Sequence, residues 1–322
     1  AYACDAVRAY GSAMTNTTHE HQHHGHGGHD HGSHDHDSVD WDAMGESLEE
    51  EGTVIAPMLE EILGWVDTIV GDDGRAPRRI LDVGSGPGVG TVSMLQRWPD
   101  AEAVAVDAGQ GLLARADRRA ADRGVADRLA TIERHLPADL TDLGRFDLIW
   151  VSMVLHHLGD GTEAVRTLAD LLEPGGVLVA VDFGDPMTFL PEDLDLGRPG
   201  LDHRLEEAVG RWLRHGHGHD DVPDDATVNG DVDALARAAG LEVVAVRDFR
   251  LRLESPLDVP SRRLLAGHLR RLQTVLADDL DPDDVAALET LLDDTHADGV
   301  HRSDRVHLDT SRRVHVIAAP TA

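Results

Sequence analysis

The sequence predicts an α/β fold built on a parallel sheet, and three observations support this prediction. Between residues 75 and 183, short apolar runs alternate with segments of helical spacing. The first apolar run ends in a glycine-rich turn at 82–88, and the second ends in the acidic residue Asp107. Strands that alternate with helices form right-handed parallel βαβ units, and a glycine-rich turn between the first strand and the first helix is typical of ligand-binding folds of this kind.

The central elements follow one another in a regular order. Pro99 and Gly124 end two of the helices, because proline lacks a backbone donor and glycine readily ends a helix. We expect strands at 79–84, 101–108, 129–135, 146–154 and 177–183, and helices at 90–99, 111–124 and 162–172.

The flanking segments predict additional helices. Residues 41–70 have apolar side chains at helical spacing, and Gly52 and Pro57 predict a break that gives two helices or one kinked helix. Residues 184–200 are rich in Pro, Gly and Asp and predict an irregular segment. Further expected elements are helices at 201–215 and 231–240, a strand at 241–255, two helices within 258–295, and a closing strand or hairpin at 305–320.

The composition predicts a soluble, cytoplasmic protein without a nucleic-acid or membrane partner. The chain has 60 acidic residues against 29 basic ones, all of them arginine, and a formal net charge of −31. Such a chain repels phosphate backbones. No apolar run approaches the roughly 18 residues of a membrane helix, and no secretory signal is visible. Residues 1–13 contain the only cysteine and are interpreted as an expression remnant before Met14, which leaves no thiol for catalysis or zinc binding.

The glycine-rich turn predicts a site for an adenosyl ligand. Its glycines, Gly84, Gly86 and Gly88, are spaced G-x-G-x-G, whereas a dinucleotide site uses G-x-G-x-x-G. The nearby carboxylate of Asp82 would repel a pyrophosphate but suits a ligand with an ammonium and a sulfonium group. Asp107 can accept hydrogen bonds from two ribose hydroxyls. The alternative is a purely structural tight turn with a solvated aspartate.

Four segments resemble successive motifs of the class I S-adenosylmethionine-dependent methyltransferases, and most closely those of bacterial small-molecule enzymes. They are LDVGSGPG at 81–88, AVAVDA at 103–108, FDLIWVSMVLHHL at 146–158 and LLEPGGVLVAVD at 171–182. The resemblance implies a Rossmann-like, doubly wound sheet of seven strands with the last strand antiparallel. It also implies methyl transfer from S-adenosylmethionine to a small-molecule acceptor, with S-adenosylhomocysteine as the product.

Composition and sequence pattern predict a division of the chain, and the resemblance implies a set of cofactor-binding residues. We expect an expression remnant at 1–13, a disordered His-rich tail at 14–40, an N-terminal helical lid at 41–74, a cofactor-binding core at 75–183, an insertion at 184–230, and the rest of the core at 231–322 with a helical insertion at 258–295. The implied cofactor-binding residues are Asp82, Gly84, Ser85, Gly86, Gly88, Asp107, Ala108, Gly109, Arg134, His135, Leu136, Ser152 and Met153. Residues 134–136 depart from the acid and small residue typical of the family, which leaves the adenine contacts open.

Two histidines after the fourth strand are candidates for a general base. His156 and His157 lie on the ligand-binding side of the predicted sheet, and an imidazole can accept a proton at neutral pH. The alternative is that this segment serves in packing and capping. A base is needed only if the acceptor loses a proton.

A histidine-rich tract near the N-terminus predicts loose binding of divalent metals, separate from the active site. It lacks the fixed spacing of a catalytic zinc site. Its members are His19, His21, His23, His24, His26, His29, His31, His34 and His36. Two rival functions remain, namely a nicotinamide-dependent oxidoreductase and a metal-handling protein that uses a Rossmann-like scaffold.

The additions outside the core are expected to select the acceptor. Segments 41–70 and 184–220 should roof the pocket, with Trp41, Met44, Phe189 and Trp212 as candidates for its lining. Ordinary core packing is the alternative for each of these side chains. The helices within 258–295 could contribute to the pocket, pack on the sheet edge or contact another subunit in a homodimer.

Overall fold

The computed structural model describes residues 41–70, 76–134, 140–155, 158, 160–191, 196–214 and 232–319, without the side chains of 41–43, 213 and 214. The helices are α2 (Trp41–Val70), α3 (Val89–Arg97), α4 (Gln110–Asp122), η2 (Ala126–Arg128), η3 (Thr141–Leu143), α5 (Gly161–Ala169), α6 (Leu201–Arg214), α7 (Val232–Ala238), α8 (Val259–Val275) and α9 (Pro282–Leu292). The strands are β1 (Arg79–Val83), β2 (Glu102–Asp107), β3 (Leu129–Glu133), β4 (Phe146–Ser152), β5 (Leu172–Phe183), β6 (Glu242–Leu253) and β7 (Leu308–Ala318).

The strands form one seven-stranded sheet in the order β3-β2-β1-β4-β5-β7-β6. Strands β1 to β5 pair in parallel, and β7 is antiparallel to both β5 and β6. The predicted doubly wound sheet with an antiparallel last strand is therefore confirmed. The closing segment forms the single strand β7, which settles the choice left open between a strand and a hairpin.

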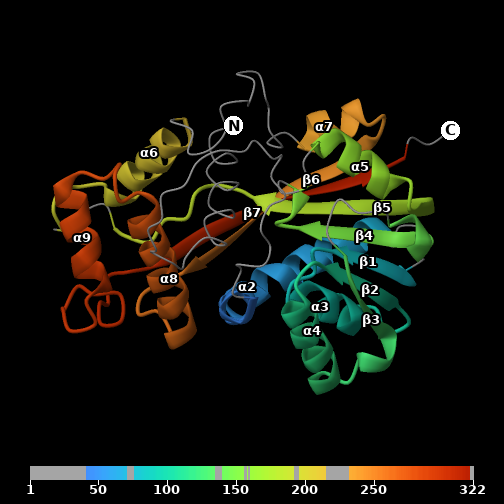
Figure 1. Cartoon of the computed structure of the whole chain (residues 1–322), viewed down its shortest axis with the longest axis horizontal. Coiled ribbons are helices and arrows are strands. Elements are labelled where there is room, and N and C mark those ends of the chain that lie inside the picture. The colour runs from blue at the N-terminus through green and yellow to red at the C-terminus, as the bar shows by residue number, and fades with distance from the viewer. Residues whose placement is uncertain are drawn as a thin grey trace, which may run out of the picture.

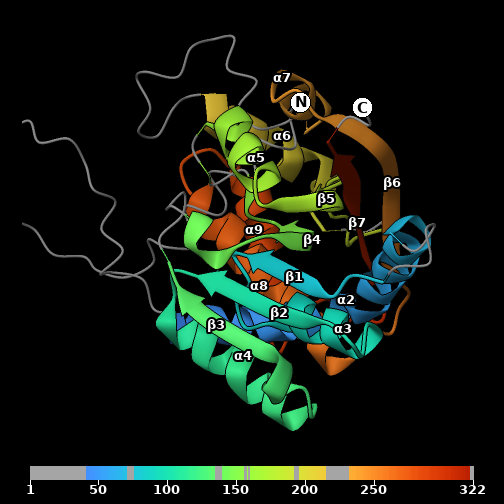
Figure 2. The same ribbon diagram turned by 90° about the vertical axis from the view of Figure 1, so that its right-hand side faces the viewer.

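Helices cover both faces of the sheet. One core cluster joins α5 and α7 to one face, through residues such as Val165 and Ala236. The other face is covered by α2, α3 and α4 (Figure 2). Because helices cover both faces, the central strands are apolar on both sides, and Leu81 and Leu148 are fully buried. None of the helices in these described parts has the length and apolar character needed to cross a membrane.

The N-terminal segment forms one helix of 30 residues, so of the two alternatives, two helices or one kinked helix, the structure excludes the division into two. Pro57 lies inside this helix. Gly52 is needed for packing: a Cβ there would lie 2.7 Å from the side chain of Val89. The glycine lets α2 approach α3 closely, and it does not end the helix.

Helices α6, α8 and α9 form a helical lobe beyond the carboxyl ends of β5 and β6 (Figure 1). The lobe shares one continuous hydrophobic cluster with α2 and with β6 and β7. Helix α8 packs against α2. This packing of α8 on α2 is not one of the arrangements predicted for segment 258–295.

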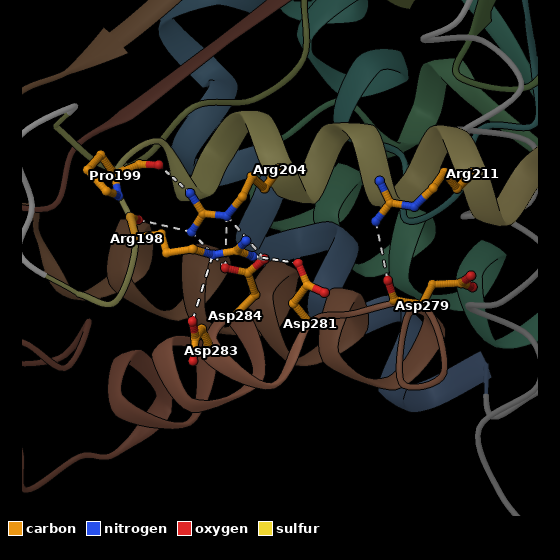
Figure 3. A network of polar contacts seen from close by, with 8 residues as sticks. All are labelled: Arg198, Pro199, Arg204, Arg211, Asp279, Asp281, Asp283 and Asp284. Atoms are coloured by element: carbon orange, nitrogen blue, oxygen red, sulfur yellow. Dashed lines mark hydrogen bonds and ion pairs between the residues drawn. The ribbon is translucent and has the colours of Figure 1, made fainter.

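An ion-pair network fastens α6 to α9 within the lobe (Figure 3). Arg204 of α6 binds Asp284 of α9 through Nη2 and Oδ1 at 2.6 Å, and it also donates to the carbonyl oxygens of Arg198 and Pro199. Asp284 is 3% exposed and also binds Arg198 at 3.0 Å. A buried carboxylate with two guanidinium partners holds the two helices in one relative position.

Candidate active site

The candidate site lies at the carboxyl edge of the parallel strands. The glycine-rich turn follows β1, Asp107 ends β2, and Ser152 ends β4. Strands β2, β1 and β4 are neighbours in the sheet, so their ends meet at this edge. In open α/β sheets ligands bind beyond the carboxyl ends of the strands. The fold therefore brings together the three segments that the sequence marks for ligand binding.

The glycine-rich turn depends on backbone conformations that favour glycine. Gly84, Gly86 and Gly88 have φ angles of 70°, 54° and 74°. A Cβ on Gly88 would lie 2.6 Å from the Cβ of Ala116 on α4. A Cβ on Gly86, by contrast, would meet among the described residues only Leu48 of α2, at 3.7 Å. The turn therefore contacts α4 closely at Gly88, whereas Gly86 has free space beside it.

Asp107 links the end of β2 to the glycine-rich turn. Its Oδ2 accepts a hydrogen bond from the Gly86 N–H and its Oδ1 from the Gly109 N–H, both at 2.8 Å. Burial raises the pKa of this carboxyl, while the hydrogen bonds from Gly109 and Gly86 oppose the rise. A carboxylate has about four acceptor positions, so both oxygens can still accept from a bound ligand.

Asp82 is the most strongly perturbed acid of the site. It is 3% exposed, and its Oδ2 accepts a hydrogen bond from the Thr91 hydroxyl at 2.5 Å. Burial raises the pKa of Asp82 to about 7, the Thr91 hydrogen bond opposes this rise, and the charge of Asp107 adds to it. An ionised Asp82 would be stabilised by a cation, so this end of the turn favours a positively charged ligand group.

Ser85 carries a polar atom that has no partner within the described residues. Its side chain is 8% exposed and its Oγ makes no hydrogen bond there. A buried hydroxyl without a partner costs free energy, on the order of 1–3 kcal/mol. A ligand in the turn could accept or donate this hydrogen bond, so the Oγ is available to the group that the turn would hold.

The end of β4 has an unusual backbone conformation. Met153 has a φ of 61°, which is rare outside glycine, and its N–H donates to the carbonyl oxygen of Val181 at 2.9 Å. The side chain of Val154 lies so close to Gly84 that a Cβ on this glycine would clash with it. Strained residues of this kind cluster at functional sites. The bend places Val154 against Gly84 of the glycine-rich turn.

The remaining predicted site residues divide into described and undescribed positions. Ala108 and Gly109 lie between Asp107 and α4. Arg134 follows β3, and its Nη2 binds Asp142 at 2.9 Å. The predicted residues outside the described part of the chain are His135, Leu136, His156, His157 and the histidines of the N-terminal tract.

The first half of α2 is acidic and is paired with arginines from three elements, namely α4, α8 and β7. Glu49 binds Arg115 of α4 at 2.8 Å, and Glu51 binds Arg312 of β7 at 2.8 Å. The sequence analysis did not find these pairs, because Glu51 and Arg312 lie far apart in the chain. The run of glutamates in α2 was the only available signal.

Two of the four expected pocket-lining residues pack in the core instead. Phe189 is 1% exposed and contacts the ring of His268 with centroids 6.0 Å apart. Trp212 packs partly buried against the same hydrophobic cluster. Met44 is partly exposed on α2, and the side chain of Trp41 lies outside the described residues.

The sheet order, the antiparallel last strand and the acid-flanked glycine turn define the class I methyltransferase fold. Residues 81–178 match the family model described as a methyltransferase domain. The fold is therefore that of the class I methyltransferases, and residues 81–178 are similar in sequence to a methyltransferase domain.

The curated relatives match between 32% and 43% of this chain. A trans-aconitate 2-methyltransferase of Rhodococcus jostii is 46% identical over 126 residues, 38% of this chain and 46% of the relative. A demethylmenaquinone methyltransferase of Thermus thermophilus is 34% identical over 116 residues, 35% of this chain and 50% of the relative. Across such relatives the chain spans only 26% to 50% of their length.

Solved structures show a more distant likeness. A methyltransferase of Geobacter sulfurreducens, in complex with S-adenosyl-L-homocysteine, is 16% identical with a TM-score of 0.40, over 79% of this chain and 90% of that one.

Proposed function

We propose that this chain transfers a methyl group from S-adenosylmethionine to a small-molecule acceptor. The observation that carries the proposal is a pair of buried acids on the carboxyl edge of the sheet: Asp82 at the start of the glycine turn, and Asp107 at the end of β2, where it accepts from the Gly86 N–H. The relatives named above are methyltransferases whose names specify small molecules, which supports an acceptor of the same size class.

The acids of the site fit the polar groups of this cofactor. Asp82 would pair with the ammonium of the methionine part, and Asp107 would accept from the ribose hydroxyls. The unpartnered Ser85 hydroxyl would bind the methionine part as well. A carboxylate at the first turn disfavours a pyrophosphate, so the geometry supports this cofactor over a nicotinamide dinucleotide. The adenine would lie by Ala108 and Gly109, with 134–136 as further candidates, and Ser152 and Met153 would line the methyl group.

Methyl transfer from a sulfonium requires few chemical groups from the protein. When bound, S-adenosylmethionine supplies a methyl group on a sulfonium, which an acceptor atom can displace in line. The protein then mainly holds the acceptor in line and excludes water. His156 or His157, just after β4, would take a proton if the acceptor must lose one.

Beyond the acceptor, we propose divalent metals as partners of the N-terminal histidines. The histidines at 19–36 would bind nickel or zinc through imidazole groups, and this binding would be independent of methyl transfer. A homodimer and a cytoplasmic location are further expectations from the sequence. A metal-handling role for the whole chain is the second candidate, and it predicts metal binding without cofactor binding.

Titration calorimetry with S-adenosylhomocysteine tests the proposal. Asp107→Ala should weaken binding by about 2–4 kcal/mol, because charge-assisted hydrogen bonds to the ribose are lost. Asp107→Asn keeps the size of the side chain and can accept from only one of the two N–H donors, so it should give an intermediate loss.

A matched control separates this loss from a general effect of charge. Asp122 is an exposed aspartate at the end of α4, and Asp122→Ala should bind as the wild type does. Thermal melting of each variant shows whether the turn still folds. Unchanged affinity in a folded Asp107→Ala protein would refute the proposed site.

A further inference from the structure

A cavity of about 230 Å³ lies between α2 and the α8 helix of the helical lobe. It shares no lining residue with the glycine-rich turn. Its polar lining consists of Ser47 and Glu50 from α2, Arg263, Arg270 and Arg271 from α8, and His301. We call this space the arginine cavity.

The arginine cavity carries an excess of positive charge. Three guanidinium groups line it against the single carboxylate of Glu50, which lies 3.4 Å from Arg263. Within the described part of the chain, no carboxylate comes within ion-pair distance of Arg270. This excess is unusual in a chain with a net charge of −31. Three guanidinium groups in one cavity suit a ligand with anionic oxygens, since their planar donors match carboxylate and phosphate geometry.

The position of the cavity relates it to the candidate active site. Leu48 of α2 points to the glycine-rich turn, as its contact with Gly86 shows. At about 100° per residue, Ser47 and Glu50 point roughly 100° to 160° away from Leu48 around the axis of α2. Ser47 and Glu50 therefore face α8. Glu51 projects between their direction and that of Leu48, and it binds Arg312 of β7. The arginine cavity and the glycine turn are thus separated by about one helix width, on the order of 10 Å.

We propose that the arginine cavity binds the carboxylate or phosphate group of a small organic molecule, and that this molecule is the methyl acceptor. The second part rests on the proposed function. The volume suits a small polar group, being below the roughly 300–1,000 Å³ of pockets for drug-sized ligands. An acceptor anchored here by its anionic group would extend along α2, past Glu51, toward the glycine turn.

Calorimetric titration with two probes tests the binding site. Citrate serves as the carboxylate probe and inorganic pyrophosphate as the phosphate probe, both at one fixed ionic strength because salt screens exposed charges. Arg270→Gln and Arg271→Gln should weaken the binding of the preferred probe by about tenfold or more, since each removes a charge-assisted hydrogen bond. Arg270 is exposed, so its substitution leaves the fold intact.

Arg118→Gln is the matched control. Arg118 is an exposed arginine on α4 that lines neither the cavity nor the glycine turn, so this variant should bind both probes as the wild type does. Failure of both probes to bind the wild type, or equal binding by wild type and Arg270→Gln, would overturn the anion site.

Parallel titrations with S-adenosylhomocysteine separate this proposal from the proposed function. Probe binding without S-adenosylhomocysteine binding would refute the methyltransferase and leave the anion site standing. S-adenosylhomocysteine binding without probe binding would overturn the anion site alone. An acceptor site must also bind in the presence of the cofactor product, so loss of probe binding to the S-adenosylhomocysteine complex would overturn the acceptor assignment.

Discussion

The buried carboxyl of Asp82 should make the ligand-free protein less stable as pH rises. Its pKa is 3.8 in an unperturbed chain and about 7 in the fold, mainly because burial disfavours the charged form. The folded chain therefore binds this proton more tightly than the unfolded chain. The resulting stabilisation is complete below pH 3.8 and is lost as pH rises through about 7.

The magnitude follows from the size of the shift. A rise of about 3 pKa units corresponds to about 4 kcal/mol between the protonated and ionised forms. Asp82→Asn keeps the shape and removes the charge, so it should stabilise the ligand-free protein by at most about 4 kcal/mol at about pH 8.5. Linkage reduces this gain to about 2 kcal/mol at about pH 5.5, where the folded wild type is protonated.

Urea denaturation followed by tryptophan fluorescence measures both values, and Trp150 lies close to Gly90 and Asp82 in the fold. The exposed Asp122→Asn variant should show no such dependence on pH. At about pH 8.5, Asp82→Asn should also bind S-adenosylhomocysteine more weakly than the wild type, because the carboxylate that would meet the ammonium is gone. A stability gain that stays the same at both pH values would refute the assignment of a raised pKa to Asp82.

Two further predictions concern the lobe and the tail. Arg204→Met should lower the free energy of unfolding by about 2–4 kcal/mol in urea denaturation, because Asp284 stays buried with only Arg198 as a partner. The double variant Arg204→Met, Asp284→Leu should regain part of this loss. Unchanged stability of the single variant would contradict the prediction. Deletion of 14–38 should remove most nickel and zinc binding in calorimetric titrations and leave the affinity for S-adenosylhomocysteine unchanged, and a loss of that affinity would show that the tail belongs to the site.

The central strands and the glycine turn could be predicted because their signals are local. Strands β1, β2, β4 and β5 each contain a short apolar run that is largely buried, and each is followed by a turn with its own residue pattern. The turn at 82–88 requires positive φ angles, which residues other than glycine avoid. The same requirement produces the spaced glycines that identify the turn in the sequence.

Other features could not be predicted because they depend on contacts between distant parts of the chain. Gly52 looks like a helix breaker in sequence, yet it serves to bring α2 against Val89 of α3. Glu51 and Arg312 are separated by 261 residues, so no local pattern shows their ion pair. The arginines of α8 can be read from the sequence, but the sequence does not show that α2 lies opposite them.

The parts of the fold that would select the acceptor lie outside the part shared with the family. The family match covers 81–178, which contains the glycine turn, Asp107 and the end of β4. Both helices that form the arginine cavity, α2 and α8, lie outside this match. Similarity to the family model therefore bears on the cofactor side of the site, while the acceptor has to be inferred from this chain's own α2 and α8. Since those helices present three guanidinium groups to one carboxylate, the inference they support is an anionic acceptor.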